Sequence, residues 1–136
     1  MKTLIIFYSY TGHAKERAQA LAAQEPADIT EISDVRRPGT LKAYSRGCFA
    51  AIRGKAWQIK PLDVNAAEYD RLILFSPVWA SNPPPAVNAL LAQLPEGKAV
   101  SVKMVSKSGK SSCKDRVESI IKSKGCTLES FEDFKN

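Results

Sequence analysis

Apolar runs that predict buried strands alternate along this chain with stripes of apolar residues at helical spacing. Leu4–Tyr8 and Arg71–Ser76 are short runs rich in β-branched, aromatic and aliphatic residues, which suits strands buried on both faces of a parallel sheet. Asp28–Ser33, Lys98–Val105 and Cys126–Phe134 complete a set of five predicted strands. Strands that alternate with helices form parallel sheets covered on both faces. The alternation therefore predicts an α/β fold, a doubly wound five-stranded parallel sheet.

Four helices are predicted from apolar residues three and four positions apart. Their stripes are Ala14, Ala18, Leu21 and Ala22; Leu41, Tyr44, Cys48 and Ile52; Val87, Leu90, Leu91 and Leu94; and Cys113, Val117, Ile120 and Ile121. Pro38-Gly39 predicts a turn before the second helix, and Gly125 ends the fourth. No helical stripe follows the fifth strand.

Length bears on the number of domains, and charge bears on whether the protein binds nucleic acid. The 136 residues are expected to form one domain, residues 1–136. The net charge of +6 comes from scattered lysines and arginines, and no nucleic-acid-binding module matches. A solvated basic surface is preferred to a nucleic-acid partner.

Cysteine and histidine usage bears on metals and compartment. Three cysteines without a C-x-x-C pair, and His13 as the one histidine, favour free thiols over disulfides or a zinc site. The apolar part of the N-terminal segment is too short for a signal peptide, and no run has membrane-spanning length. We expect a cytoplasmic protein with no metal and no membrane partner.

Three polar loops follow three of the predicted strands. They are Ser9–Ala14, Pro77–Pro83 and Ser106–Ser112. Ligands of doubly wound sheets bind at the carboxyl ends of the strands, near the point where strand order reverses. We therefore expect these three loops to lie together and to form the ligand site.

The first loop, SYTGHA, suits an anion. Hydroxyls of Ser9 and Thr11 can donate to phosphate oxygens, and Gly12 permits a tight turn close to a ligand. Amides at the start of the next helix favour negative charge. The same two hydroxyl residues could equally cap the helix.

The other two loops carry an indole and two lysines. Trp79 could stack on a flat ring, although aromatic residues more often pack in the core. In the third loop, Gly109-Lys110-Ser111 resembles the end of a nucleotide-triphosphate loop, but that motif requires glycine where Met104 stands. G-x-G-x-x-G is absent too, so neither a triphosphate loop nor a Rossmann site is predicted.

Taken together, these residues resemble the flavodoxin family over nearly the whole chain. The segment YSYTGHAKERAQALA is similar to the family's first phosphate loop, and YDRLILFSPVWASNPPPAV to the segment that carries its flavin-stacking loop. The resemblance implies a flavodoxin-like fold that binds FMN noncovalently. In this family the flavin performs the redox chemistry, so no catalytic side chain is expected.

The resemblance also implies which residues contact FMN. The first loop and the helix start would bind the 5′-phosphate, Trp79 would stack on the isoalloxazine ring, and the third loop would close the far side. The full set is Ser9, Tyr10, Thr11, Gly12, His13 and Ala14; Pro77, Val78, Trp79, Ala80, Ser81 and Asn82; and Ser106, Lys107, Ser108 and Gly109.

The chain departs from the family at several positions. His13-Ala14 stands where the family commonly has Asn-Thr, which removes a hydroxyl, although His13 could replace an amide donor. Ser81 stands where glycine is common beside the flavin, and a side chain there would oppose a glycine-dependent peptide rotation. The third loop lacks the family's tyrosine or acidic residues, and a charge of +6 fits poorly with the basic reductases that acidic carriers bind.

Three functions follow. The first is an FMN-binding redox protein that transfers electrons, either as a carrier or as a small reductase with an unknown protein or small-molecule acceptor. The second is an NAD(P)H-dependent FMN or quinone oxidoreductase, in which Lys107 or Lys110 could attract nucleotide phosphates. The third is a flavin-free interaction domain. Because no helix is predicted after Phe134, we also expect an apolar sheet face to be left open, and with it a possible homodimer.

Overall fold

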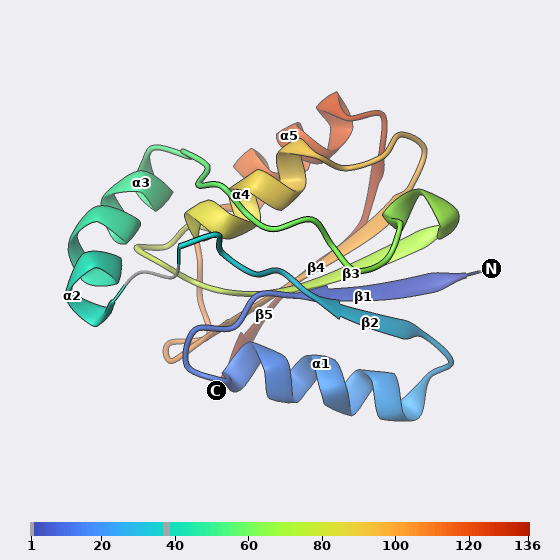
Figure 1. The fold of residues 1–136 in the computed structure, drawn as a ribbon, viewed down its shortest axis with the longest axis horizontal. Coiled ribbons are helices and arrows are strands. Elements are labelled where there is room, and N and C mark those ends of the chain that lie inside the picture. The colour runs from blue at the N-terminus through green and yellow to red at the C-terminus, as the bar shows by residue number, and fades with distance from the viewer. Residues whose placement is uncertain (1, 37–38) are drawn as a thin grey trace.

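The computed structural model describes residues 2–36 and 39–136, and it is built on a five-stranded sheet in which every strand pairing is parallel (Figure 1). The strands are β1 (Thr3–Phe7), β2 (Asp28–Glu31), β3 (Arg71–Pro77), β4 (Ala99–Ser106) and β5 (Thr127–Lys135). Their order across the sheet is β2-β1-β3-β4-β5, so strand order reverses between β1 and β3. The predicted fold class and all five predicted strands are confirmed.

Helices lie on both sides of this sheet. They are α1 (His13–Gln24), α2 (Thr40–Lys42), the π-helix η1 (Ala43–Gly47), α3 (Cys48–Ile52), the 3₁₀-helix η2 (Ala66–Glu68), α4 (Pro85–Ala92) and α5 (Lys114–Ser123). Figure 1 shows α4 and α5 on one side and α1 on the other. No helix in the described part of the chain is long and apolar enough to cross a bilayer.

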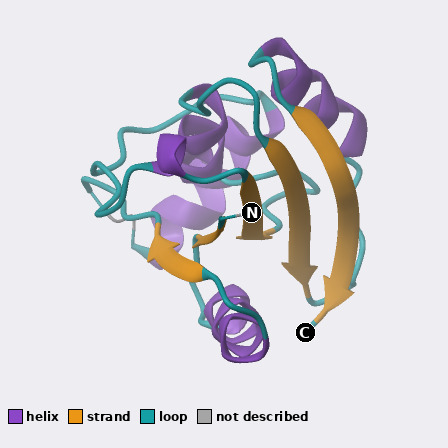
Figure 2. Cartoon of the chain, turned by 90° about the vertical axis from the view of Figure 1, so that its right-hand side faces the viewer, coloured by secondary structure: helices purple, strands orange, loops and turns teal. Residues whose placement is uncertain are grey.

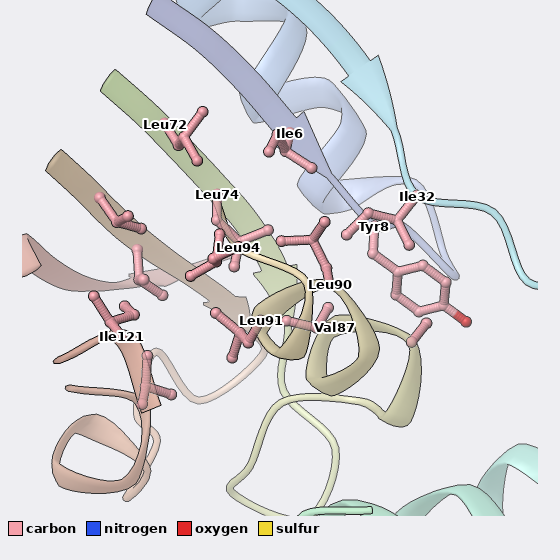
Figure 3. Packing of buried hydrophobic residues seen from close by; sticks show 14 of the residues in the cluster. Ile6, Tyr8, Ile32, Leu72, Leu74, Val87, Leu90, Leu91, Leu94 and Ile121 are labelled. Carbon is pink, nitrogen blue, oxygen red and sulfur yellow. The ribbon is translucent and has the colours of Figure 1, made fainter. Parts of the chain in front are cut away.

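The face under α4 and α5 contains the larger part of the core (Figure 3). Alternate residues of the strands point toward it, as the pleat of a sheet requires, and helix residues fill the space above them. Its fully buried members include Leu4, Ile6, Leu72, Leu74, Val100, Met104, Val87, Leu91, Val117 and Ile121. Continuous packing on this face fixes the ends of β1, β3 and β4, and so the starting points of the three loops.

Of the described helices, only α1 covers the opposite face, and Figure 2 shows this helix below one part of the sheet. Ile5 and Phe7 of β1 pack with Ile73 and Phe75 of β3 and with small residues of α1. In register beside Phe75 lies Lys103 of β4, and beside Lys103 lies Glu132 of β5. Lys103 Nζ is 2.5 Å from Glu132 Oε1. The surface becomes polar where no helix covers it.

This polar surface is a correction to the expected open apolar face. Among the described residues, the large apolar side chains with high exposure are instead Val35, Leu41, Phe49 and Ile52. They belong to the segment that precedes β3, at the opposite end of the sheet order from β5. The homodimer stays a prediction.

The second predicted helix is replaced by three short pieces, α2, η1 and α3. Leu41 is 83% exposed and Ile52 is 51% exposed, whereas the small residues Ala50 and Ala51 are buried. A π-helix changes the number of residues per turn, so the predicted spacing of 3.6 no longer places the large residues on one face. Pro38 of the predicted turn and the Tyr44 side chain of the predicted stripe lie outside the described residues.

Candidate functional site

The three predicted loops meet at the carboxyl edge of the sheet and enclose two adjacent cavities. The large cavity, of about 600 Å³, is lined by Tyr10, Thr11, Thr40, Cys48, Val78, Trp79 and Ala80. The small cavity, of about 160 Å³, is lined by Ser9, Tyr10, Thr11, His13, Ala14, Pro77, Val78, Trp79, Val105, Ser106, Lys107 and Asn136. Because Tyr10, Thr11, Val78 and Trp79 line both, one ligand could occupy the two together.

The small cavity lies at the start of α1. Gly12 has a φ of +101°, a conformation that only glycine adopts easily, and a Cβ there would meet no atom within 4 Å. The Gly12 amide donates to Ser9 Oγ at 2.9 Å. The first bond of the helix ladder is donated by Glu16 N–H to the Gly12 carbonyl. The amides of His13 and Ala14 therefore precede the ladder, as in helix starts that bind anions.

This geometry separates the two roles considered for Ser9 and Thr11. The N-cap position of α1 is Gly12, and no side chain caps it. Ser9 instead accepts the Gly12 amide and stabilises the turn, so its hydroxyl hydrogen remains available to donate. Thr11 is exposed and lines both cavities. Helix capping is thus not what these hydroxyls do here.

Trp79 is both a core residue and a wall of the site. Its exposed fraction is 9%, and it belongs to the larger core cluster. Its ring is edge-to-face with Tyr10, at 5.6 Å between centroids, and with Tyr8, at 6.2 Å. On another side it contacts η1, where a Cβ on Gly47 would come within 2.6 Å of Trp79 Cζ3. Only glycine fits there, and η1 therefore fixes the indole against the large cavity.

A strained turn follows Trp79. Trp79 and Asn82 exchange two backbone hydrogen bonds, of 2.8 and 3.0 Å. The two residues between them, Ala80 and Ser81, have φ values of +50° and +66°. Type I′ turns have positive φ at both central positions and usually contain glycine or asparagine there. Each non-glycine residue in this region costs about 1–3 kcal/mol, so the conformation persists only where its surroundings enforce it.

The third loop is bonded to the end of β5. The Gly109 amide donates to Ser106 Oγ at 3.0 Å, and the Asn136 amide donates to the Ser106 carbonyl at 2.9 Å. Gly109 has a φ of +72° and lies so close to Lys135 that a Cβ would be 3.0 Å from the lysine Cβ. Ser106 and Lys107 reach the small cavity, and Asn136 joins them there.

Cys48 is half-buried and lines the large cavity. Burial raises the pKa of its thiol above the ordinary value, so the thiol is protonated at neutral pH. Because the thiolate is the nucleophilic form, Cys48 acts here as a small apolar wall.

Most of the predicted site residues are brought together. Eleven of the sixteen line one or both cavities; Gly12, Ser81, Asn82, Ser108 and Gly109 do not. Sequence reasoning missed Thr40 and Cys48 of the α2–α3 segment and Val105 and Asn136 near the strand ends. No sequence signal marks the first two, because they approach the loops only through the fold. Asn136 lies beside the third loop for the same reason.

A further cavity, of about 510 Å³, lies away from the three loops. It is lined by Val35, Arg36, Arg46, Trp57 and Gln58. None of the predicted site residues lines it, and no helix-start amides are among its walls. The described residues hold no group of three or more His, Cys, Asp or Glu side chains that could bind a metal ion.

Comparison with known proteins shows the fold. A flavoprotein in complex with FMN from Lactobacillus acidophilus is 21% identical, with a TM-score of 0.75 over 96% of this chain and 91% of that one. A putative flavoprotein from Bacteroides eggerthii is 20% identical, with a TM-score of 0.78 over 96% and 86%. Flavodoxin 1 from Bacillus cereus is 18% identical, with a TM-score of 0.56 over 100% and 86%.

These structures define the class to which the fold belongs: the chain has a flavodoxin-like fold, as the resemblance implied. No protein-family model and no curated protein matches the sequence.

Proposed function

We propose that this chain is an FMN-binding, flavodoxin-like redox protein that transfers electrons through a noncovalently bound flavin. The observation that carries the proposal is the pairing of two different cavities across shared walls. One is a large slot with mainly apolar walls, and the other is a small cavity at a helix start, where polar and apolar groups contribute about equally. A flat ring joined to a phosphate needs one site of each kind.

The small cavity suits the phosphate end. Residues that line this cavity include Ser9 and Thr11, which carry hydroxyls, His13 and Ala14 at the start of α1, and Lys107. Each can donate a hydrogen bond to an anionic oxygen, and bonds to a charged oxygen are the stronger kind. Ala14 adds no hydroxyl, so we expect fewer side-chain contacts than the family's usual sequence would provide.

The large cavity suits the ring end. Tyr10, Val78 and Trp79 offer aromatic and aliphatic surface, and their burial restricts the positions that a bound ring can take. When bound, FMN would supply the redox chemistry itself. The chain's own residues would orient the ring and exclude water from part of it, with Cys48 as a neutral neighbour because its thiol is protonated.

The test is a titration of FMN with purified protein, followed by quenching of flavin fluorescence, with riboflavin as the ligand that lacks the phosphate. We expect saturable quenching by both, with FMN bound more tightly. No quenching of either flavin at high protein concentration would refute the proposal and would favour a flavin-free interaction domain.

A matched pair of variants sharpens this test. Thr11→Val keeps the shape of a residue at the small cavity but removes its hydroxyl, and we expect roughly ten- to hundredfold weaker FMN binding with riboflavin binding unchanged. Thr127→Val makes the same change at an exposed position on β5 and should alter neither. Equal losses for both flavins in Thr11→Val would contradict phosphate binding at this loop.

NADPH oxidation with a quinone acceptor then separates a carrier from an oxidoreductase. Lys107 lines the small cavity whereas Lys110 lines neither, so of the two lysines only Lys107 is positioned to serve either function. We also propose the cytoplasm as the compartment, on the ground that Cys48, Cys113 and Cys126 are all free thiols.

A further inference from the structure

Arg116 of α5 lies where three separate parts of the chain meet. Its Nη1 donates to the Ala51 carbonyl at 3.0 Å and to Asn82 Oδ1 at 3.0 Å, and its Nη2 donates to the Ile52 carbonyl at 2.8 Å. The side chain is half-buried. One guanidinium thus binds α3 and the turn after Trp79 at once.

On one side, Arg116 stabilises the strained turn. Asn82 accepts from Arg116 through its side-chain oxygen and donates through its side-chain nitrogen to the Ala80 carbonyl at 2.8 Å. The Ser81 carbonyl accepts the Ser112 amide at 3.2 Å. Both residues with positive φ therefore have their carbonyls bonded to other groups, as expected where surroundings enforce an unfavourable conformation.

On the other side, Arg116 binds the end of α3. Ala51 and Ile52 are the last two residues of that helix, where the end of the helix attracts positive charge. The Ala51 carbonyl also accepts the Gly54 amide at 3.0 Å. The chain then turns at Gly54, with a φ of +67°, and a Cβ there would lie 3.6 Å from Arg116 Nη1. The backbone thus passes close to the guanidinium.

The two elements that Arg116 joins both contribute walls to the large cavity. Val78, Trp79 and Ala80 line it from the turn, and Thr40 and Cys48 line it from the α2–α3 segment. We propose that Arg116 is a positioning residue that fixes these two walls relative to each other and so sets the width of the slot for the flavin ring. This inference rests on the proposed function, since it assigns the ring end of the same site.

The geometry requires arginine. The guanidinium is planar and has five N–H donors, so it can donate to three acceptors that lie in different directions. A lysine ammonium is compact and cannot reach all three acceptors at once. Lysine at this position keeps the charge but loses the simultaneous bonds to both walls. Arg116→Lys therefore separates the effect of geometry from the effect of charge.

The experiment is the same flavin titration on Arg116→Lys and Arg116→Gln. We expect FMN and riboflavin to lose affinity by the same factor, about tenfold, the size of one charged hydrogen bond. The ratio of the two affinities should stay that of the unchanged protein, whereas Thr11→Val changes that ratio. Unchanged riboflavin affinity, or a loss confined to FMN, would overturn the inference.

Two further variants exclude a general loss of stability. Val117→Ala alters the next residue of α5, which is fully buried, so it should lower thermal stability but leave both affinities within about twofold. Ser81→Gly removes strain from the turn, because glycine adopts positive φ freely, and in the Arg116→Gln background it should restore part of the lost affinity. The inference would be overturned if Ser81→Gly restored no flavin affinity in the Arg116→Gln background and Val117→Ala lost as much flavin affinity as Arg116→Gln.

A flavin-free readout keeps this inference distinct from the proposed function. If the unchanged protein binds neither flavin, the proposed function fails. Amide exchange of Ser112, whose N–H bonds to Ser81, still reports on the turn: it should accelerate in Arg116→Lys but not in Val117→Ala. Unaltered exchange would mean that Arg116 does not fix the turn.

Discussion

The two faces of the sheet differ in what covers them, and their side chains differ in the same places. Under α4 and α5, apolar residues extend from β1 across β3 to β4 without interruption. On the face of α1, a lateral row passes from Phe7 through Phe75 to Lys103 and Glu132. The first two residues of that row pack in the α1 cluster. The last two form an ion pair beyond it.

One face of the sheet is therefore covered by packed helices. On the other face, apolar side chains give way to polar ones where α1 no longer covers the sheet. The next row shows the same change, since Ile5 and Ile73 are followed by Ser101 and Ser130. On this face no described helix covers β5, and the polar side chains mean that no broad apolar surface is left there. The two faces should respond differently to substitution.

The largest effect is expected on the packed face. Leu91→Ala removes a fully buried side chain between α4 and the sheet, and we expect a loss of about 3 kcal/mol in the free energy of unfolding, measured by urea denaturation. Leu41→Ala makes the same substitution at an 83% exposed position and should cost under about 0.5 kcal/mol. Equal losses would contradict the difference in burial.

A smaller effect is expected where the two kinds of surface meet. Phe134 is half-buried, with Arg17 Cζ at 4.5 Å and Lys103 Nζ at 5.6 Å from its ring centroid. Phe134→Ala loses apolar contact with the α1 cluster and both cation–π contacts, so we expect a loss of about 2 kcal/mol. Phe134→Leu, which keeps most of the apolar volume, should lose less than half of that.

The polar part of the α1 face should tolerate substitution best. Lys103 has a side chain that is 16% exposed, and its partner Glu132 is 49% exposed. In Lys103→Ala the glutamate returns to water, so unfolding measurements should give a loss under about 1 kcal/mol, reduced further by salt. Lys103→Met, which retains the buried alkyl chain, should lose less still. A loss above about 3 kcal/mol would show that this face depends on a buried charge.

The last effect is a pH dependence of stability that begins only above about pH 10. Tyr69, in the cluster under α4 and α5, donates to Asp28 Oδ2 at 2.6 Å. This hydrogen bond, with burial and nearby carboxylates, raises the Tyr69 pKa to about 12. The folded state therefore favours the neutral phenol. The stability it contributes is complete below the unfolded pKa of about 10 and is lost as pH rises toward 12.

Alkaline unfolding of Tyr69→Phe tests this. The variant should lose the part of the pH dependence that lies between about pH 10 and 12 and keep the rest. Identical alkaline profiles for both proteins would show that the phenol has the same pKa in the folded and unfolded states.

The fold was predictable because its strands are apolar runs and its topology follows from alternation. The location of the site was predictable from the topology, since parallel strands bring loops 9–14, 77–83 and 106–112 to one edge of the sheet. Local patterns could not show the π-helix, because its spacing differs from 3.6. Nor could they show the positive φ of Ala80 and Ser81, because neither residue type indicates it. From the sequence alone, Arg116 is expected to be a solvent-exposed residue of an amphipathic helix. Its contacts with α3 and with the turn after Trp79 appear only in the folded structure.

The position of β5 at the end of the sheet has a consequence for self-association at high concentration. In the described part of the chain, one backbone edge of β5 has no strand beside it, and an open edge is a template on which a second strand can add. The pairing of β4 with β5 is interrupted by a register shift between Val100 and Ser101, and β5 carries Glu129, Glu132 and Asp133. Charged side chains and an irregular pairing are features that disfavour the addition of a second strand at such an edge.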